Sequence, residues 1–223
     1  MGTPGFALPS LRILLEHQYS IVGVVTVPDK PSGRGQHVNA SPVKQFALEH
    51  ALPVLQPASM SDPAFAAELR ALSPDVFVVV AFRILPASVF AIPRLGAFNL
   101  HASLLPKYRG AAPINWAIIR GERETGVTTF FLREAVDTGS IILQARVPIT
   151  PEETAGELHD VLADVGAEIV LHTVRLIETG KATPHVQDDA QASPAPKIFK
   201  EDCRIDWNKL PSELVNFIRG LSP

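Results

Sequence analysis

The stretch Ile21-Val22-Gly23-Val24-Val25-Thr26 is almost wholly apolar and rich in β-branched residues. Such a run is typical of a strand that is buried on both faces of a parallel sheet. A second run of the same kind is Asp75-Val76-Phe77-Val78-Val79-Val80-Ala81. Before the first run, leucines recur at helical spacing and predict a helix over residues 6–17. Helices that alternate with buried strands predict an α/β fold, with an open, mostly parallel sheet and helices on both faces.

The rest of the chain supplies further elements of both kinds. Helices are predicted over residues 42–50, 62–72, 86–91, 112–120 and 152–179. Strands are predicted near residue 54 and over residues 126–132 and 141–147, and a further strand is predicted to start at residues 96–98. After residue 183 the composition shifts to Gln, Asp, Ala, Ser and Pro, which is typical of a linker. We therefore predict a main domain over residues 1–183, a linker over 184–200 and the start of a second domain over 201–223.

Composition limits the classes of function. The formal net charge is −3 at pH 7, so a nucleic acid would have to be bound by a local basic segment. The single cysteine, Cys203, excludes an internal disulfide and fits a reducing cytosol. The longest apolar run, from Val76 to Phe82, is far too short to span a bilayer. These features predict a cytoplasmic protein that does not interact with membranes.

The stretch Asn99-Leu100-His101-Ala102-Ser103-Leu104-Leu105-Pro106-Lys107-Tyr108-Arg109-Gly110 carries side chains suited to chemistry. Residues two apart on a strand share a face, so Asn99 and His101 would project side by side. Ligands of open α/β sheets bind beyond the carboxyl ends of strands, and this strand would end near Ser103. An amide and an imidazole there can polarise a carbonyl and move a proton. They can equally satisfy the backbone at a strand end, and the residues alone leave both interpretations open.

Asn-x-His-x-Ser-Leu-Leu-Pro in that stretch, followed later by Asp137-Thr138-Gly139, resembles the signature of the folate-dependent formyltransferases. Its continuation to Ile114 is similar to the methionyl-tRNA formyltransferases of that family, as are three other segments: Gly2-Thr3-Pro4-Gly5-Phe6, Pro28-Asp29-Lys30-Pro31-Ser32-Gly33-Arg34-Gly35 and Arg204-Ile205-Asp206-Trp207. The resemblance spans nearly the whole chain and implies a Rossmann-like formyltransferase fold. It also implies transfer of a formyl group from 10-formyltetrahydrofolate, a co-substrate, to the α-amino group of initiator methionyl-tRNA. No metal is implied, and the enzyme is expected to act as a monomer.

The resemblance further implies a catalytic set, which consists of Asn99, His101 and Asp137. An Asn amide can stabilise a developing oxyanion, and a His can donate a second hydrogen bond or act as the base. An Asp can orient that His or accept the amine proton through water. Which group takes the proton stays open at this point.

The folate pocket implied by the resemblance is formed by residues of two segments. They are Phe82, Ile84, Leu85, Ser103, Leu104, Leu105, Pro106 and Gly110. The first segment departs from the family, which usually has a Tyr-Gly-Gln-Ile-Leu-Pro-like stretch here. This chain has Phe82-Arg83-Ile84-Leu85-Pro86, which is one residue shorter and lacks the glycine, so the pocket is expected to differ in shape.

The segment from Pro28 to Pro42 is rich in Pro, Gly and Ser and carries several basic residues. A structureless loop of that length is uncommon and is usually functional or disordered. It is either a solvated insertion or a basic finger that grips phosphates. In the methionyl-tRNA formyltransferases the corresponding loop reaches the acceptor end of the tRNA. The resemblance therefore implies Lys30 and Arg34 as tRNA contacts.

Two parts of the family pattern are expected to be missing. In the family an apolar first strand precedes Gly-Thr-Pro and lies centrally in the sheet, whereas here Met1 directly precedes that motif. Unpaired buried backbone groups cost about 1–3 kcal/mol each. We therefore expect that sequence upstream supplies the strand, that another segment takes its place, or that a gap lies beside residues 21–26. The family also continues into a small β-barrel domain, which is expected to be missing after Pro223.

Other functions fit the residues less well. A nicotinamide-dependent oxidoreductase would need Gly-x-Gly-x-x-Gly after its first strand, and Gly2-Thr3-Pro4-Gly5 is not that motif. The sugar-nucleotide formyltransferases and the hydrolase domain of formyltetrahydrofolate dehydrogenase share Ser-Leu-Leu-Pro. The Gly33-Arg34-Gly35 loop and Ile205-Asp206-Trp207 favour tRNA over those substrates. A catalytically silent folate- or RNA-binding module is disfavoured by the intact catalytic set.

Overall fold

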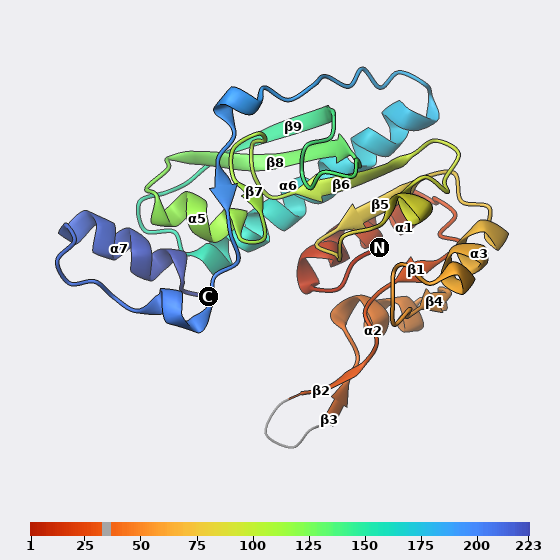
Figure 1. The fold of residues 1–223 in the computed structure, drawn as a ribbon, viewed down its shortest axis with the longest axis horizontal. Coiled ribbons are helices and arrows are strands. Elements are labelled where there is room, and N and C mark those ends of the chain that lie inside the picture. Colours follow the sequence, from red (N-terminus) through yellow and green to blue (C-terminus); the bar gives the residue numbers. More distant parts are fainter. Residues whose placement is uncertain (33–36) are drawn as a thin grey trace.

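The computed structural model describes residues 1–32 and 37–223 (Figure 1). Its largest sheet contains four strands, in the order β5 (Phe77–Val80), β6 (Ala97–His101), β8 (Glu124–Phe131) and β9 (Ile141–Pro148). β5 and β6 are parallel, whereas β8 is antiparallel to both β6 and β9. A second, parallel pair consists of β1 (Val24–Val25) and β4 (Val54–Leu55).

Met1 and Gly2 lie between β1 and β5 and join the two sheets. The backbone N–H of Gly2 donates to the carbonyl of Val25 at 3.0 Å, and Gly2 forms a parallel bridge with Val80. The amino group of Met1 donates to the carbonyl of Val78 at 2.7 Å. These two residues therefore occupy the position of a strand between β1 and β5, but only over a two-residue length.

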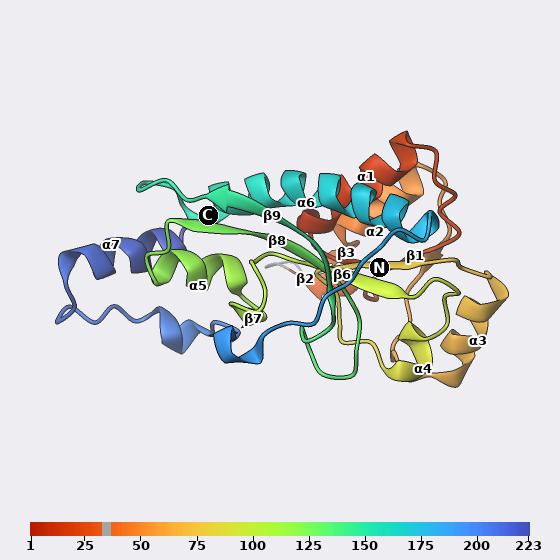
Figure 2. The ribbon, with the colours of Figure 1, turned by 90° about the horizontal axis from the view of Figure 1, so that it is seen from above.

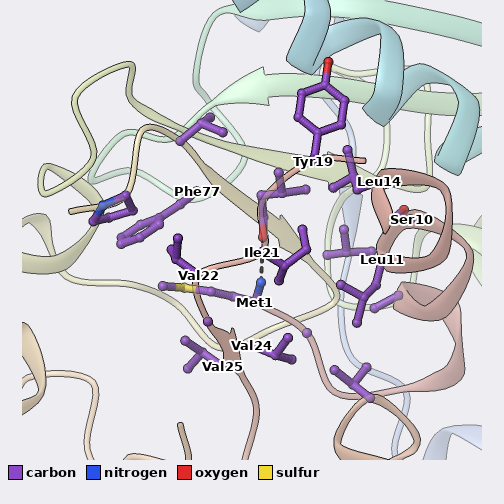
Figure 3. Close-up of a pocket in the computed structure, with 18 of the residues that line it drawn as sticks. Met1, Ser10, Leu11, Leu14, Tyr19, Ile21, Val22, Val24, Val25 and Phe77 are labelled. Carbon is purple, nitrogen blue, oxygen red and sulfur yellow. Dashed lines mark hydrogen bonds between the residues drawn. The ribbon is translucent and has the colours of Figure 1, made fainter. Parts of the chain in front are cut away.

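A cavity of about 160 Å³ lies beside Met1 (Figure 3). Its lining is mostly apolar and includes Ile21, Val22 and Phe77. Residues 21–23 form no strand, although the sequence predicts one from Ile21, so the gap expected beside this stretch is present. The Met1 amino group lies at the cavity, and burial lowers its pKa to about 5.

Helices cover both faces of the sheet (Figure 2). One face carries α1 (Leu8–Glu16), α2 (Pro42–Glu49) and α6 (Ala155–Glu178), and the other carries α3 (Pro63–Ala71), α4 (Ala87–Phe90) and α5 (Pro113–Ile119). Shorter 3₁₀ helices are η1 (Gly5–Ala7), η2 (Asp189–Gln191) and η3 (Lys200–Cys203). Within the described part of the chain, no helix is both long and apolar enough to span a bilayer.

Side chains at the helix starts explain why these elements begin where they do. Thr154 accepts a hydrogen bond from the N–H of Glu157, and the Glu157 carboxylate accepts one from Thr154, which is a capping box at the start of α6. The hydrogen bond from the Thr154 backbone lowers the pKa of the Glu157 carboxyl. Along α6, Leu158, Leu162 and Val170 are fully buried, so this helix supplies much of the core on its face of the sheet.

The segment between β1 and α2 forms a hairpin that projects from the body (Figure 1). Its strands are β2 (Lys30–Ser32) and β3 (His37–Asn39), which pair antiparallel. The expectation of a structureless loop is therefore wrong for these six residues. Both strands of a two-stranded ribbon are edge strands, where proline is tolerated, so Pro31 does not prevent the pairing. Arg34 and the side chain of Lys30 lie outside the described part of the structure.

The segment after α6 runs back across the main unit. His185 and Ile141 exchange backbone hydrogen bonds of 2.8 and 3.0 Å. β10 (Pro194–Ala195) pairs parallel with β7 (Arg109–Gly110). We refer to residues 185–196 as the strap. It forms the larger part of the predicted linker, and its polar composition gives no sign of these contacts.

Beyond the strap, α7 (Pro211–Gly220) packs against α5. The Asn115 side chain donates to the carbonyl of Gly220 at 2.8 Å, and the Trp116 indole donates to the carbonyl of Pro196 at 2.8 Å. Residues far apart in the sequence are thus held together around α5. The division into three domains stays a prediction.

Candidate active site

Asn99 and His101 lie on β6, as the sequence predicts. In the register with β8, Asn99 pairs with Phe130 and His101 with Thr128. Strand alternation places both side chains on the same face of the sheet. His101 is buried, whereas Asn99 is partly exposed and lines a cavity of about 100 Å³.

The ring of His101 is oriented by a backbone carbonyl. Its Nε2 lies 2.8 Å from the carbonyl oxygen of Tyr108. A carbonyl oxygen only accepts hydrogen bonds, so Nε2 carries the hydrogen and Nδ1 keeps the lone pair in the neutral ring. Nδ1 lies 3.9 Å from Oδ2 of Asp137. A proton taken up by His101 would therefore be held next to a carboxylate.

Tyr108 is itself held firmly, which fixes the position of its carbonyl. Its φ of 61° lies in the left-handed region. Its hydroxyl donates to Oε1 of Glu122 at 2.7 Å, and its N–H donates to Oγ of Ser193 at 2.9 Å. Burial, together with the Glu122 carboxylate, raises the pKa of the Tyr108 hydroxyl.

Asp137 accepts a hydrogen bond from the N–H of Gly110 at 2.9 Å through Oδ2. Gly110 has a φ of 128°, and a Cβ at this position would lie 2.5 Å from the carbonyl oxygen of Ala195. Both facts require glycine here. A Cβ on Gly139 would lie 1.6 Å from the carbonyl oxygen of Phe131, which explains the glycine of the Asp-Thr-Gly motif.

The loop that follows β6 is held by side chains of β8 and β9. Oγ1 of Thr128 donates to the carbonyl of Ser103 at 2.6 Å and accepts from the N–H of Leu105 at 3.1 Å. Nε2 of Gln144 donates to the carbonyl of Leu105 at 2.9 Å. Oγ of Ser103 donates to the carbonyl of Lys107 at 2.6 Å. These bonds shape the loop that delivers the Tyr108 carbonyl to His101.

The predicted folate-binding residues divide into two groups. Phe82, Ile84 and Leu85 line the 100 Å³ cavity together with Asn99 and Asp137. The other five do not line the described part of this cavity; they are Ser103, Leu104, Leu105, Pro106 and Gly110. Among them, Gly110 donates its N–H directly to Asp137. The assignment of all eight to folate stays a prediction.

The structure adds Gln187 of the strap, which the sequence did not single out. Its side chain is buried and donates to the carbonyl oxygens of Asp137 and Gly139, at 2.8 Å each. No motif marks this glutamine, because it lies among polar and small residues that are typical of a linker. Only the folded path of the strap brings it to the site.

Comparison with known proteins shows the family to which this chain belongs. Residues 10–174 match the family model described as "Formyl transferase". The chain therefore belongs to the formyltransferase family and is an enzyme that transfers a formyl group, as its sequence predicts.

Similar proteins of this family are methionyl-tRNA formyltransferases. The chain is 55% identical over 227 aligned residues to the methionyl-tRNA formyltransferase of Bacteroides thetaiotaomicron, covering 100% of this chain and 70% of that protein. It is 51% identical over 224 residues to the methionyl-tRNA formyltransferase of Flavobacterium johnsoniae, covering 100% of this chain and 71% of that protein. The similarity thus extends over the whole length of this chain.

Solved structures support the fold. An N-formyltransferase from Helicobacter canadensis, in complex with folinic acid and dTDP-3-aminofucose, gives a TM-score of 0.75 at 24% identity, with 98% of this chain and 78% of that chain covered. The sugar 3N-formyl transferase WlaRD, in the presence of dTDP and 5-N-formyl-THF, gives 0.73 at 24% identity, with 98% and 76% covered. The predicted α/β formyltransferase fold is confirmed.

Proposed function

We propose that this enzyme transfers the formyl group of 10-formyltetrahydrofolate to the α-amino group of initiator methionyl-tRNA, the step that prepares this tRNA for translation initiation. The observation that carries the proposal is the 51–55% identity to methionyl-tRNA formyltransferases along the entire chain. The arrangement of Asn99, His101 and Asp137 supplies the chemistry. We further propose that the protein acts in the cytoplasm as a monomer.

The 100 Å³ cavity suits the folate co-substrate. Phe82, Leu85, Phe90 and Phe130 supply apolar and aromatic walls, and Asn99 and Asp137 are among the polar residues of the lining. Apolar walls with a few well-placed polar groups are typical of sites for flat organic ligands. A pterin ring held against these walls places its one-carbon group near the Asn99 amide. 10-Formyltetrahydrofolate supplies the activated formyl group.

Asn99 is assigned the role of polarising the formyl carbonyl. When an amine attacks that carbonyl, negative charge develops on its oxygen, and the amide N–H groups of Asn99 stabilise it. A donor of this kind typically contributes ~10²–10³ in rate. The position of Asn99 on the lining of the cavity supports this role.

His101 is assigned the role of proton acceptor. Its Nε2 hydrogen is engaged by the Tyr108 carbonyl, so the free lone pair is on Nδ1. Nδ1 takes the proton from the attacking amine, directly or through a water, and Asp137 stabilises the imidazolium that results. The bond between the formyl carbon and N10 of the folate then breaks, and the proton passes to N10 as tetrahydrofolate leaves. General base catalysis of this kind contributes ~10²–10⁴. Nδ1 and Oδ2 lie 3.9 Å apart, too far for a direct hydrogen bond.

Lys30 and Arg34 are proposed to contact tRNA phosphates. The β2–β3 hairpin projects from the body of the enzyme, and a projecting ribbon is a suitable support for contacts with a bulky substrate (Figure 1). At the base of the hairpin, Asp29 accepts hydrogen bonds from Lys44 and from Gln56. The hydrogen bond from Lys44 is the main cause that lowers the pKa of the Asp29 carboxyl. This anchor joins the hairpin to α2.

A choice of acceptors tests the proposal. The enzyme is incubated with 10-formyltetrahydrofolate and either methionyl-tRNA or a dTDP-linked amino sugar, and the formylated product is measured. Formylation of methionyl-tRNA alone is the expected result. Formylation of the amino sugar alone, or release of formate without either acceptor at the same rate, contradicts the proposal.

A further inference from the structure

Gln187 uses its whole hydrogen-bonding capacity around Asp137. Its Nε2 donates to the carbonyls of Asp137 and Gly139, at 2.8 Å each. Its Oε1 accepts from Nε and Nη2 of Arg109, at 3.1 and 2.7 Å. A glutamine amide offers two donors and two acceptor positions, and all are occupied here. The side chain is also only 7% exposed, so water does not compete for these partners.

These bonds close a ring that includes both the backbone carbonyl and the side-chain carboxylate of Asp137. Gln187 holds the backbone carbonyl of Asp137 and also holds Arg109. Arg109 is followed by Gly110, whose N–H binds Oδ2 of Asp137 at 2.9 Å. Outside the ring, Arg109 Nη2 pairs with Asp189 of the strap at 2.7 Å. The carboxylate of Asp137 is thus fixed relative to its own backbone through the strap.

Asp137 needs such support because of its backbone conformation. Its φ of 56° lies in the left-handed region, which residues other than glycine adopt rarely. The preceding residues 133–136 are exposed and offer little packing. Without the two bonds from Gln187, the loop is free to relax and to withdraw the carboxylate from Gly110 and from His101.

We infer that Gln187 is a positioning residue for catalysis, which acts by fixing Asp137 beside His101. This inference rests on the proposed catalytic role of Asp137. The competing interpretation is that Gln187 merely attaches the strap to the main unit. The two interpretations differ in whether the effect of Gln187 on the reaction requires Asp137. A positioning residue affects the reaction only through Asp137, whereas a residue that only attaches the strap affects it independently of Asp137.

Steady-state kinetics provide the first test, on the full chain with both substrates. In Gln187→Ala and in Gln187→Met, which preserves side-chain length, kcat is expected to fall between about 10-fold and 100-fold, because small misplacements of a catalytic group cost that much. KM for the folate is expected to change less than about twofold. The matched control is Gln191→Ala, in the same strap, whose exposed amide binds only Asp188 at 2.8 Å.

A double-mutant cycle separates the two interpretations. In the Asp137→Asn background, Gln187→Ala is expected to lower kcat by no more than about twofold further, because its effect is exerted through the Asp137 carboxylate. Independent, multiplying losses would overturn the inference. So would kcat values for Gln187→Ala equal to those of Gln191→Ala.

A measurement without turnover keeps the inference testable if the role of Asp137 in catalysis fails. The amide proton of Gly110 donates to the Asp137 carboxylate, and its NMR shift and exchange rate report that bond. In Gln187→Ala both are expected to move towards the values of Asp137→Asn, whereas the Ala112 amide, which donates to Ala195 of the strap at 3.2 Å, keeps its protection. An unchanged Gly110 amide, or equal loss of protection at Ala112, overturns the inference. Unchanged kcat in Asp137→Asn would instead count against the proposed function alone.

Discussion

Nδ1 of His101 lies 3.9 Å from Oδ2 of Asp137, while Nε2 of the same ring donates to the carbonyl of Tyr108 at 2.8 Å. The carbonyl determines which nitrogen carries the hydrogen, and the carboxylate determines where a gained proton is stabilised. The separation exceeds a hydrogen bond, so Nδ1 and the carboxylate do not bind each other directly. This relationship is the basis of the proposed role of His101 as a base, with Asp137 as its counter-ion.

Asp137→Asn is expected to lower kcat by ~10²–10⁴, because the imidazolium formed at His101 loses its counter-ion. KM for the folate is expected to change little, since the apolar walls of the cavity are unaltered. Steady-state formylation of methionyl-tRNA measures both constants. A normal kcat in this variant would remove Asp137 from the catalytic set.

Asn99→Ala is expected to lower kcat by ~10²–10³, because one oxyanion donor is lost. The same loss should occur with methionyl-tRNA at any concentration, since Asn99 acts on the formyl group rather than on the tRNA. A change in KM for tRNA with unchanged kcat would show that Asn99 binds substrate without assisting the reaction.

Arg34→Ala is expected to raise KM for methionyl-tRNA. If Arg34 binds a phosphate, the slope of log affinity against log salt should also fall by about 1, because one counter-ion fewer is released. Lys181→Ala, at an exposed position after α6, serves as the matched control. An equal loss in formate release measured without tRNA would mean that the hairpin shapes the active site instead.

The stability of the 223-residue chain is expected to fall as the pH decreases from 8 to 5. Burial lowers the pKa of the Met1 amino group from 8.0 to about 5. Between those values the unfolded chain holds a proton that the folded chain does not, so the free energy of unfolding decreases with decreasing pH. At about 1.4 kcal/mol per pKa unit, the loss is about 4 kcal/mol. Urea unfolding at several pH values measures it.

N-terminal acetylation provides the control for this pH dependence, because it removes the titrating amine and leaves every other group in place. The acetylated chain should lack the extra loss of stability below pH 8. Identical pH profiles for both forms would show that the Met1 amine does not carry the effect.

The sequence predicted those features that are encoded locally. Alternation along β6 placed Asn99 and His101 on one face, whereas Asp137 as the partner of His101 was implied only by the family resemblance. The long helix predicted over residues 152–179 corresponds to α6 (Ala155–Glu178). The alternation and the helix each depend on neighbours within a few residues, which is where sequence patterns carry information.

Features that depend on distant pairing were not predictable in the same way. The apolar run from Ile21 predicts a longer strand than β1, because a strand forms only where a partner pairs with it. The strap is polar in composition, yet Gln187 and Ser193 bind Asp137, Arg109 and Tyr108 from more than forty residues away. The composition of a segment indicates whether its side chains are buried, but it does not predict that a polar segment such as the strap crosses the site.

His101 is proposed to accept the amine proton during formyl transfer to methionyl-tRNA. The most direct test follows transfer of a labelled formyl group from 10-formyltetrahydrofolate to methionyl-tRNA in a single turnover at saturating substrate. The comparison is between His101→Ala and the matched control His159→Ala, whose ring contacts Asp160 and Phe6 away from the site. A near-normal rate is expected for the control and a rate lower by ~10²–10⁴ for His101→Ala. A near-normal rate in His101→Ala would show that His101 is not the proton acceptor.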